Sequence, residues 1–112
     1  MSRRTKTPEL LPGTLYLLVL RALASGTLHG YAIARRIEAA SGGVLHIEEG
    51  SLYPALNRMV VKGWLRADWG VSEHNRRARF YRLTSTGRKQ LAEESSAFDS
   101  LINAIRLVMR TA

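Results

Sequence analysis

Hydrophobic residues in the first half of the chain recur every three or four positions, which is the spacing that lines one face of an α-helix. Three segments show this pattern, and Gly, Pro or Ser residues separate them. They predict helices over residues 14–24, 29–41 and 51–62. Thr14 and Ser51 have side chains suited to cap the first and third helices. The first helix is apolar on almost every side, so we expect it at the centre of a domain.

The second half of the chain changes to a two-residue period. Aromatic, aliphatic and arginine side chains alternate over residues 64–69 and 79–84, which predicts two β-strands. The polar segment 70–78 joins them as a hairpin, and an isolated hairpin is stable only when it packs against other elements. A last helix of about 22 to 25 residues follows, capped by Thr84 or Thr86, because apolar residues return to helical spacing.

The order helix, helix, helix, hairpin, helix is that of a winged helix-turn-helix domain with one additional helix. In such domains the third helix enters the major groove of DNA, and the hairpin, called the wing, grips the backbone. We therefore expect a mainly α fold with three divisions. Residues 1–9 form a flexible basic arm, residues 10–84 the winged helix-turn-helix DNA-binding domain, and residues 85–112 a C-terminal dimerisation helix.

Composition narrows the class of protein. With 112 residues, 46% of them hydrophobic, the chain is suited to one packed domain. It has no cysteine, which excludes disulfide frameworks, Cys-based zinc sites and thiol nucleophiles. The basic start carries no apolar signal segment, and the longest apolar run, residues 15–20, is far below the ~20 residues of a membrane span. We expect a soluble, cytoplasmic protein.

Charge points to a polyanionic partner. The net charge is +8 and the pI is about 10.8. Residues 64–90 hold seven Lys or Arg side chains against two acidic ones, so the excess is concentrated around the predicted wing. The alternatives are a solvated basic face without a partner, an acidic substrate or an anionic lipid. Charge alone does not separate DNA from RNA.

The third predicted helix carries polar groups that can read DNA. Ser51 and Tyr53 offer hydroxyl groups, while Asn57 and Arg58 suit paired contacts with adenine and guanine edges. Separations of six and seven residues are close to two helical turns, so Ser51, Asn57 and Arg58 are expected along one outward face. The alternative is that these residues are only the polar half of an amphipathic helix.

Five runs of the chain carry a resemblance to a known family: LLPGTLYLLVLRAL (10–23), LHGYAIARRIE (28–38), EEGSLYPALNR (48–58), KGWL (62–65) and NRRARFYRLTSTGRKQL (75–91). In this order and with these gaps they resemble the PadR family of bacterial transcriptional regulators, in its short branch with a single C-terminal helix. The resemblance implies a homodimeric winged-helix repressor. Such a repressor binds an inverted-repeat operator and leaves it when a small molecule binds.

The resemblance also implies which residues contact DNA. Those on the second predicted helix match positions near phosphate, and the others match the recognition helix or the wing. They are Tyr31, Arg35, Ser51, Tyr53, Pro54, Asn57, Asn75, Arg76, Arg77 and Arg79. Arg58 joins this set from its side-chain chemistry alone.

The last predicted helix carries an apolar stripe at heptad spacing, formed by Leu91, Phe98, Leu101, Ile102, Ile105, Val108 and Met109. The stripe predicts the seam of a homodimer, with the alternative that the helix folds back on its own domain. Some PadR-like regulators bind flat aromatic compounds at this interface against a Trp. Here Phe98 is the only aromatic residue after Tyr81, which makes it the candidate contact for a small hydrophobic or aromatic effector.

The sequence predicts no enzyme, no cofactor and no metal site. His29, His46 and His74 are far apart and lack the spacing of zinc ligands, and His29 is expected to cap the second helix. Trp64 and Trp69 are expected to pack on the helices. The competing function is a basic winged-helix module that binds RNA or another protein. Most of the eight aromatic residues fall at core positions, which is unlike the exposed stacking platforms of RNA readers and favours duplex DNA.

Overall fold

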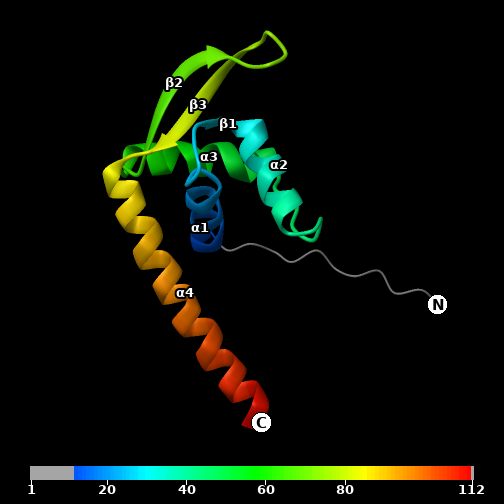
Figure 1. The fold of residues 1–112 in the computed structure, drawn as a ribbon, viewed down its shortest axis with the longest axis vertical. Coiled ribbons are helices and arrows are strands. Elements are labelled where there is room, and N and C mark those ends of the chain that lie inside the picture. Colours follow the sequence, from blue (N-terminus) through cyan, green and yellow to red (C-terminus); the bar gives the residue numbers. More distant parts are fainter. Residues whose placement is uncertain (1–11, 112) are drawn as a thin grey trace, which may run out of the picture.

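The computed structural model describes residues 12–111, which form four helices and a small antiparallel sheet (Figure 1). The elements follow one another as α1 (Pro12–Ala22), β1 (Leu28–His29), α2 (Gly30–Ala40), α3 (Glu49–Val61), β2 (Leu65–Val71), β3 (Arg77–Leu83) and α4 (Ser85–Thr111). The predicted mainly α, winged helix-turn-helix architecture is confirmed. The predicted basic arm lies outside the described residues.

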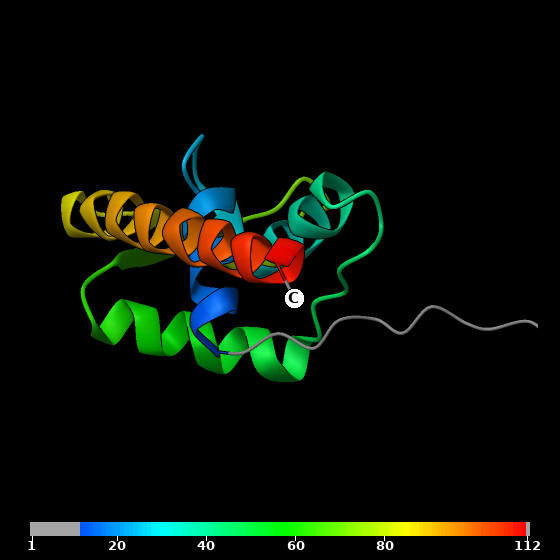
Figure 2. The same ribbon diagram turned by 90° about the horizontal axis from the view of Figure 1, so that it is seen from below.

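The hydrophobic core lies where α1, α2, α3 and the base of the hairpin meet. Val19 and Leu20 of α1 are fully buried, together with Ile33 of α2 and Leu56 and Met59 of α3. Figure 2 shows α1 between α3 on one side and α4 on the other. The expected central position of the first helix is therefore confirmed.

Helix α1 begins two residues before the predicted cap. Its first residue is Pro12, whose fixed φ and missing N–H suit the first position of a helix, where the N–H has no partner within the helix. Thr14 therefore lies inside the first turn, and the prediction that it caps the helix is wrong.

Helix α3 also begins earlier, at Glu49 rather than after Ser51. The N-cap is Glu48, whose carbonyl accepts the N–H groups of Ser51 at 3.0 Å and Leu52 at 2.9 Å. The prediction that Ser51 is the cap is wrong, because two acidic residues already lie at the positive end of the helix dipole. Pro54 consequently lies inside the helix, further in than the first turn.

The other two helix starts follow the sequence. The Nδ1 atom of His29 accepts the N–H of Ala32 at 3.2 Å, so His29 caps α2 as predicted. At α4, the Thr84 hydroxyl oxygen accepts the N–H of Gly87 at 2.9 Å, which selects Thr84 over Thr86 as the cap. Helix α4 is 27 residues long and thus slightly longer than predicted.

The sheet has the order β1-β3-β2 and is antiparallel throughout. The two-residue strand β1, which pairs with Tyr81 and Phe80 of β3, was not predicted because two residues carry no periodic signal. Strand β2 continues to Val71 and β3 begins at Arg77, so the loop of the wing spans 72–76 instead of 70–78. The paired part of the wing is therefore longer and its loop tighter than expected.

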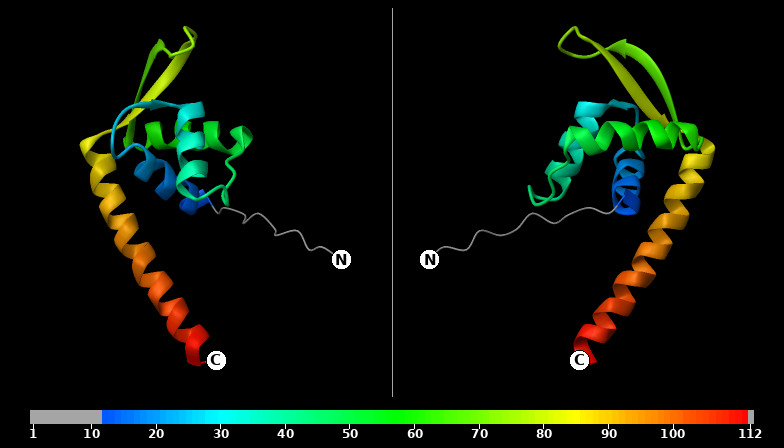
Figure 3. Two further views of the ribbon diagram at one scale, coloured as in Figure 1. Left: turned by 45° about the vertical axis from the view of Figure 1, so that its right-hand side comes forward. Right: turned by 180° about the vertical axis from the view of Figure 1, so that it is seen from behind.

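Helix α4 begins at the base of the wing and runs away from it, so its C-terminal end lies at the opposite end of the molecule (Figures 1 and 3). Its start is fixed, because Gly87 lies so close to the carbonyl oxygen of Trp64 that a Cβ would collide with it, and Leu91 packs on the core. Further along, the predicted stripe emerges from the domain. Its exposed members are Phe98, Leu101, Ile105, Val108 and Met109. The alternative that the helix folds back on its own domain therefore holds only for the first turns of α4.

Candidate nucleic-acid interface

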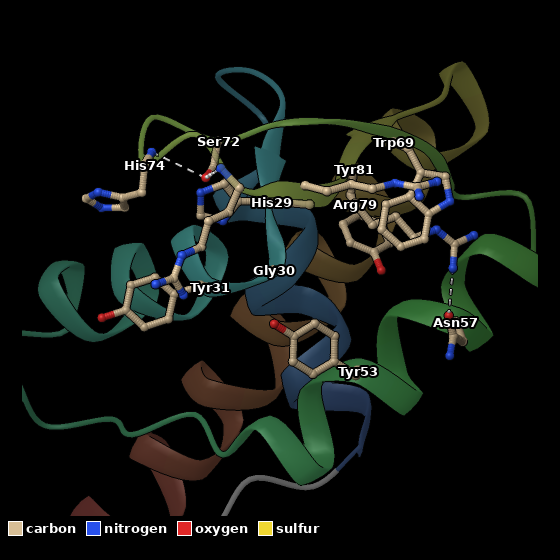
Figure 4. Close-up of a pocket in the computed structure, with 13 residues that line it drawn as sticks. His29, Gly30, Tyr31, Tyr53, Asn57, Trp69, Ser72, His74, Arg79 and Tyr81 are labelled. Atoms are coloured by element: carbon tan, nitrogen blue, oxygen red, sulfur yellow. Dashed lines mark hydrogen bonds between the residues drawn. The ribbon is translucent and has the colours of Figure 1, made fainter.

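An open hollow of about 830 Å³ lies between α3, the wing and the start of α2 (Figure 4). Six of the residues predicted to contact DNA line it: Tyr31, Tyr53, Asn57, Arg76, Arg77 and Arg79. The sequence did not assign the remaining lining residues to DNA contact, and these are His29, Gly30, Trp69, Ser72, His74, Ala78 and Tyr81. The hollow joins residues of α3 with basic residues of the wing.

The strand register decides which wing residues face this hollow. Cross-strand partners project on the same face of a sheet, and side chains alternate between faces along each strand. Tyr81 is buried in the core, so Arg79 and Arg77, two and four residues before it, lie on the same face. Trp69 is the cross-strand partner of Arg79 and shares that face. One buried tyrosine thus fixes the orientation of both arginines.

Asn57 and Arg79 connect the recognition helix to the wing. The Arg79 Nη1 atom donates to the Oδ1 atom of Asn57 at 3.5 Å (Figure 4). The Arg79 guanidinium also lies 5.8 Å from the ring centre of Tyr81, within the range of a cation–π contact. The hydrogen bond to Asn57 and the contact with the Tyr81 ring together hold the Arg79 guanidinium next to an amide on α3.

Trp69 does not pack on the helices, so this prediction is wrong for it. Its side chain is 62% exposed, and the Arg77 guanidinium lies 4.5 Å from its ring centre. Trp64 does pack as predicted, with its ring edge-on to Tyr16 at 5.7 Å. The two strand tryptophans differ because Trp64 lies at the base of the wing, whereas Trp69 lies where the helices no longer cover the sheet.

Tyr53 approaches the start of α2 closely. A Cβ on Gly30 would lie 2.6 Å from the Cε1 atom of Tyr53, so only glycine leaves room for this ring. Partial burial raises the pKa of the Tyr53 hydroxyl above its ordinary value of 10.0, with smaller effects from Glu49 and Tyr81. A tyrosine hydroxyl is protonated at neutral pH even at its ordinary pKa, so this one is available as a hydrogen-bond donor.

A contact between His29 and Glu73 ties the loop of the wing to α2. Because Nδ1 of His29 accepts the Ala32 N–H, the neutral ring carries its proton on Nε2, which lies 3.4 Å from the Glu73 Oε1. Hydrogen bonds from its own backbone N–H and from His29 lower the pKa of the Glu73 carboxyl. His29 also meets Phe80 edge-on at 5.4 Å, so it contacts the wing both at its loop and at β3.

The remaining predicted residues lie outside the lining of the hollow. Arg58 donates to the Tyr16 hydroxyl at 2.6 Å, on the α1 side of the recognition helix, so it does not share the direction of Asn57. Arg35 lies 3.7 Å from Glu38, one turn along α2. The other three are exposed: Ser51 and Pro54 in α3, and Asn75 in the loop of the wing with a φ of 59°. The predicted common face of Ser51, Asn57 and Arg58 is thus divided.

Two other kinds of site are not found in the part of the chain that the structure describes. Residues 12–111 contain no group of three or more His, Asp or Glu side chains placed to hold a metal ion. Within the same range, no helix combines the length and apolar character needed to cross a bilayer.

The sequence matches a known family over most of this fold. A model of the transcriptional regulator PadR-like family matches residues 19–93, which include α2, α3, the wing and the start of α4. The chain belongs to this family. Its members are transcriptional regulators rather than enzymes, in agreement with the prediction that this chain is not an enzyme.

Relatives of this PadR-like chain include one protein of unknown role and many solved regulators. The chain is 42% identical over 85 residues to an uncharacterised 37.1 kDa protein in transposon TN4556 of Streptomyces fradiae, a match that covers 76% of this chain but only 23% of that protein. A PadR family regulator from Eggerthella lenta is 29% identical, with a TM-score of 0.75 and coverage of 89% of this chain and 85% of that one.

A third relative was solved with nucleic acid. The structure of Bacillus subtilis PadR in complex with operator DNA superposes with a TM-score of 0.63 at 23% identity. The match covers 70% of this chain and 44% of that one. At this identity the likeness concerns the fold.

Proposed function

We propose that this chain binds duplex DNA sequence-specifically and regulates transcription as a homodimer. The observation that carries the proposal is the hollow, because residues suited to base edges and residues suited to phosphates line the same space. Asn57 belongs to the first kind, and Arg76, Arg77 and Arg79 belong to the second. The operator complex of Bacillus subtilis PadR supports the same use of this fold.

In the proposed complex, α3 lies in the major groove and the wing grips the backbone. The backbone strand between the two grooves then passes through the hollow, where the arginines of the wing neutralise its phosphates. Tyr31 lies at the start of α2 with its side chain exposed, where its hydroxyl can reach a phosphate. Arg35, Ser51, Pro54 and Asn75 extend the proposed contact beyond the hollow.

The exposed stripe of α4 supports the homodimer. Seven apolar residues lie at heptad spacing, and all but Leu91 and Ile102 are exposed in the single chain. Burying them against a second copy removes this surface from water. A two-fold dimer also places two recognition helices on one face of DNA, about 10 bp apart, so the half-sites are inverted.

The regulatory part of the proposal is a repressor that a small hydrophobic, planar effector releases, acting on cytoplasmic DNA. It rests on Phe98 and the wide apolar stripe around it. An effector that binds there favours a dimer whose recognition helices no longer match the groove spacing. If aromatic ligands bind the dimer but leave operator affinity unchanged, this release mechanism is wrong.

A competition experiment tests the function as a whole. Labelled duplex DNA from upstream of the gene is bound first, and unlabelled duplex DNA or single-stranded RNA of equal length competes for the protein. We expect the duplex to displace the label at far lower concentration. Stronger competition by the RNA would contradict the proposal and favour a basic winged-helix module that binds RNA.

A further inference from the structure

The wing exposes an indole for which the proposed DNA contacts have no role. Trp69 is 62% exposed and Val71, two residues further along β2, is 65% exposed. Both lie on the sheet face that is buried in the core at Leu65 and partly buried at Ala67. The apolar face of β2 therefore continues beyond the hydrophobic core and reaches the hollow at Trp69. Polar residues would be expected at these positions of a solvated strand.

The surroundings of this indole are strongly cationic. Arg77 lies over its ring at 4.5 Å, Arg79 is its cross-strand partner, and Arg76 lines the same hollow. Both acidic residues of the hairpin lie elsewhere: Asp68 is on the opposite face of β2, and Glu73 in the loop is turned to His29. The patch thus combines one flat apolar surface with several positive charges.

A sugar–phosphate strand of DNA has the complementary pattern. Its deoxyribose carbons are apolar, and a phosphate lies on each side of every sugar. The spacing allows an indole to cover a sugar while guanidinium groups next to it bind the flanking phosphates. An acidic peptide matches the charges but offers no regular apolar group between them.

We propose that Trp69 contacts the sugar–phosphate strand that passes between α3 and the wing, packing its indole directly against deoxyribose beside the Arg77 guanidinium. This inference rests on the proposed DNA-binding function. The contact is independent of base sequence, because every nucleotide carries the same sugar. It also neutralises no phosphate, so it releases no counterions and contributes nothing to the dependence of affinity on salt.

Fluorescence gives a direct test, because the chain has only two tryptophans. In the Trp64→Phe protein, Trp69 is the only tryptophan, and titration with random-sequence duplex DNA at low salt is expected to shift the tryptophan emission to shorter wavelength as water leaves the ring. The Trp69→Phe protein is the matched control. Its emission comes from Trp64, which packs on the core, and should stay constant.

Binding measurements on full-length variants supply a second test that does not depend on Trp64→Phe. We expect Trp69→Ala to weaken binding to operator and random duplexes alike by about 3- to 10-fold, with an unchanged slope of log affinity against log salt. Trp69→Phe should recover most of the loss. Val44→Ala, which shortens an exposed apolar side chain between α2 and α3, should bind as the unaltered protein does.

A purely indirect role has a different signature. If Trp69 acts only by placing Arg77, then Trp69→Ala lowers the salt slope by about one and has no further effect in the Arg77→Ala protein, which overturns the direct contact. If duplex binding is intact but Trp69 emission and Trp69→Ala affinity are unchanged, the inference fails and the proposed function stands. If the unaltered protein binds no duplex DNA, both the proposed function and the inference about Trp69 are wrong.

Discussion

Asn57 and Arg79 restrict each other in the unbound protein. The Asn57 Oδ1 atom accepts from Arg79 with one of its two lone pairs, and the amide N–H groups of Asn57 remain available as donors. Reading adenine with both amide atoms therefore brings the Arg79 guanidinium close to the base edge unless it turns away. At 3.5 Å the hydrogen bond is at the long end of the range and is easily exchanged. DNA can thus replace this hydrogen bond, with Asn57 binding a base edge and Arg79 binding a phosphate.

The first prediction concerns this pair. Asn57→Ala should cost about 1 to 3 kcal/mol in binding free energy on the operator and much less on random duplex DNA, because only a base-edge contact depends on sequence. Titrations by fluorescence anisotropy with both duplexes measure the difference. Asn103→Ala, an exposed asparagine on α4, is the control and should bind both as before. Equal losses on the two duplexes would assign Asn57 to backbone contact instead.

Gly30 provides a prediction about folding rather than binding. A methyl group there meets the Tyr53 ring at 2.6 Å, so Gly30→Ala should lower the free energy of unfolding by about 1 to 3 kcal/mol. Gly50→Ala is the matched control, since a Cβ at Gly50 meets nothing within 4 Å and alanine favours a helix. Urea denaturation compares them. Removing the ring with Tyr53→Ala should abolish most of the effect of Gly30→Ala, and simple additivity would refute the steric explanation.

At the scale of the elements, the sequence predicted which segments are helices and strands but not where neighbours meet. Alternation predicted the wing, yet it does not show where the helices stop covering a strand, and so the expectation that Trp69 packs on the helices is wrong. Asn57 and Arg58 were assigned to one face, although adjacent residues on a helix point about 100° apart. This angle can be worked out from the sequence, so the two residues could have been assigned to different directions. Strand β1 could not have been predicted from the sequence, because its two residues become a strand only through pairing with β3.

The wing is the element whose charge can be tested separately from its fold. Replacing both Arg76 and Arg77 by alanine should weaken all duplexes similarly and reduce the slope of log affinity against log salt by about one for each phosphate that is no longer neutralised. The matched control replaces Arg66 and Arg82, which pair with each other on the opposite face of the same hairpin. It removes the same charge but should leave the slope nearly unchanged. Equal slopes for all three proteins would exclude the wing from phosphate contact.

At the scale of the whole molecule, the two proposed interfaces lie at opposite ends. The wing and α3 form one end, and the exposed half of α4 forms the other (Figure 3). Because α4 starts from a fixed contact between Gly87 and Trp64, its direction relative to the recognition helix is set by the domain itself. A dimer formed through α4 therefore also sets the distance between two recognition helices.

The proposed dimer seam predicts a monomeric variant. Ile105→Glu places a charge in the middle of the exposed stripe, where burial without a partner is costly. The protein should become monomeric, lose operator binding and keep weak non-specific binding. Asn103→Glu adds the same charge to an exposed position off the stripe and should remain a dimer. Light scattering that shows an intact dimer for Ile105→Glu would refute the seam.

The charges along α4 also indicate how two copies are oriented. Acidic residues Glu93, Glu94 and Asp99 lie in its middle part, after Arg88 and Lys89 of the first turns, and basic residues Arg106 and Arg110 lie near its end. A parallel pair places like charges at the same height, which is unfavourable. An antiparallel pair centred on the exposed stripe brings the acidic middle part of each helix beside the basic end of the other, so we expect this arrangement.

A charge exchange tests that orientation. With the two-fold axis near the centre of the stripe, Asp99 of one copy lies level with Arg106 of the other. Asp99→Arg alone and Arg106→Asp alone should each weaken the dimer, because each leaves like charges facing one another across both ends of the seam. The protein with both changes should recover dimerisation, since the pair is restored with its signs reversed. Sedimentation at a series of protein concentrations measures all four dissociation constants, and at high salt their differences should shrink. Losses that simply add in the double variant would exclude the antiparallel register, while the apolar seam probed at Ile105 would be unaffected by that result.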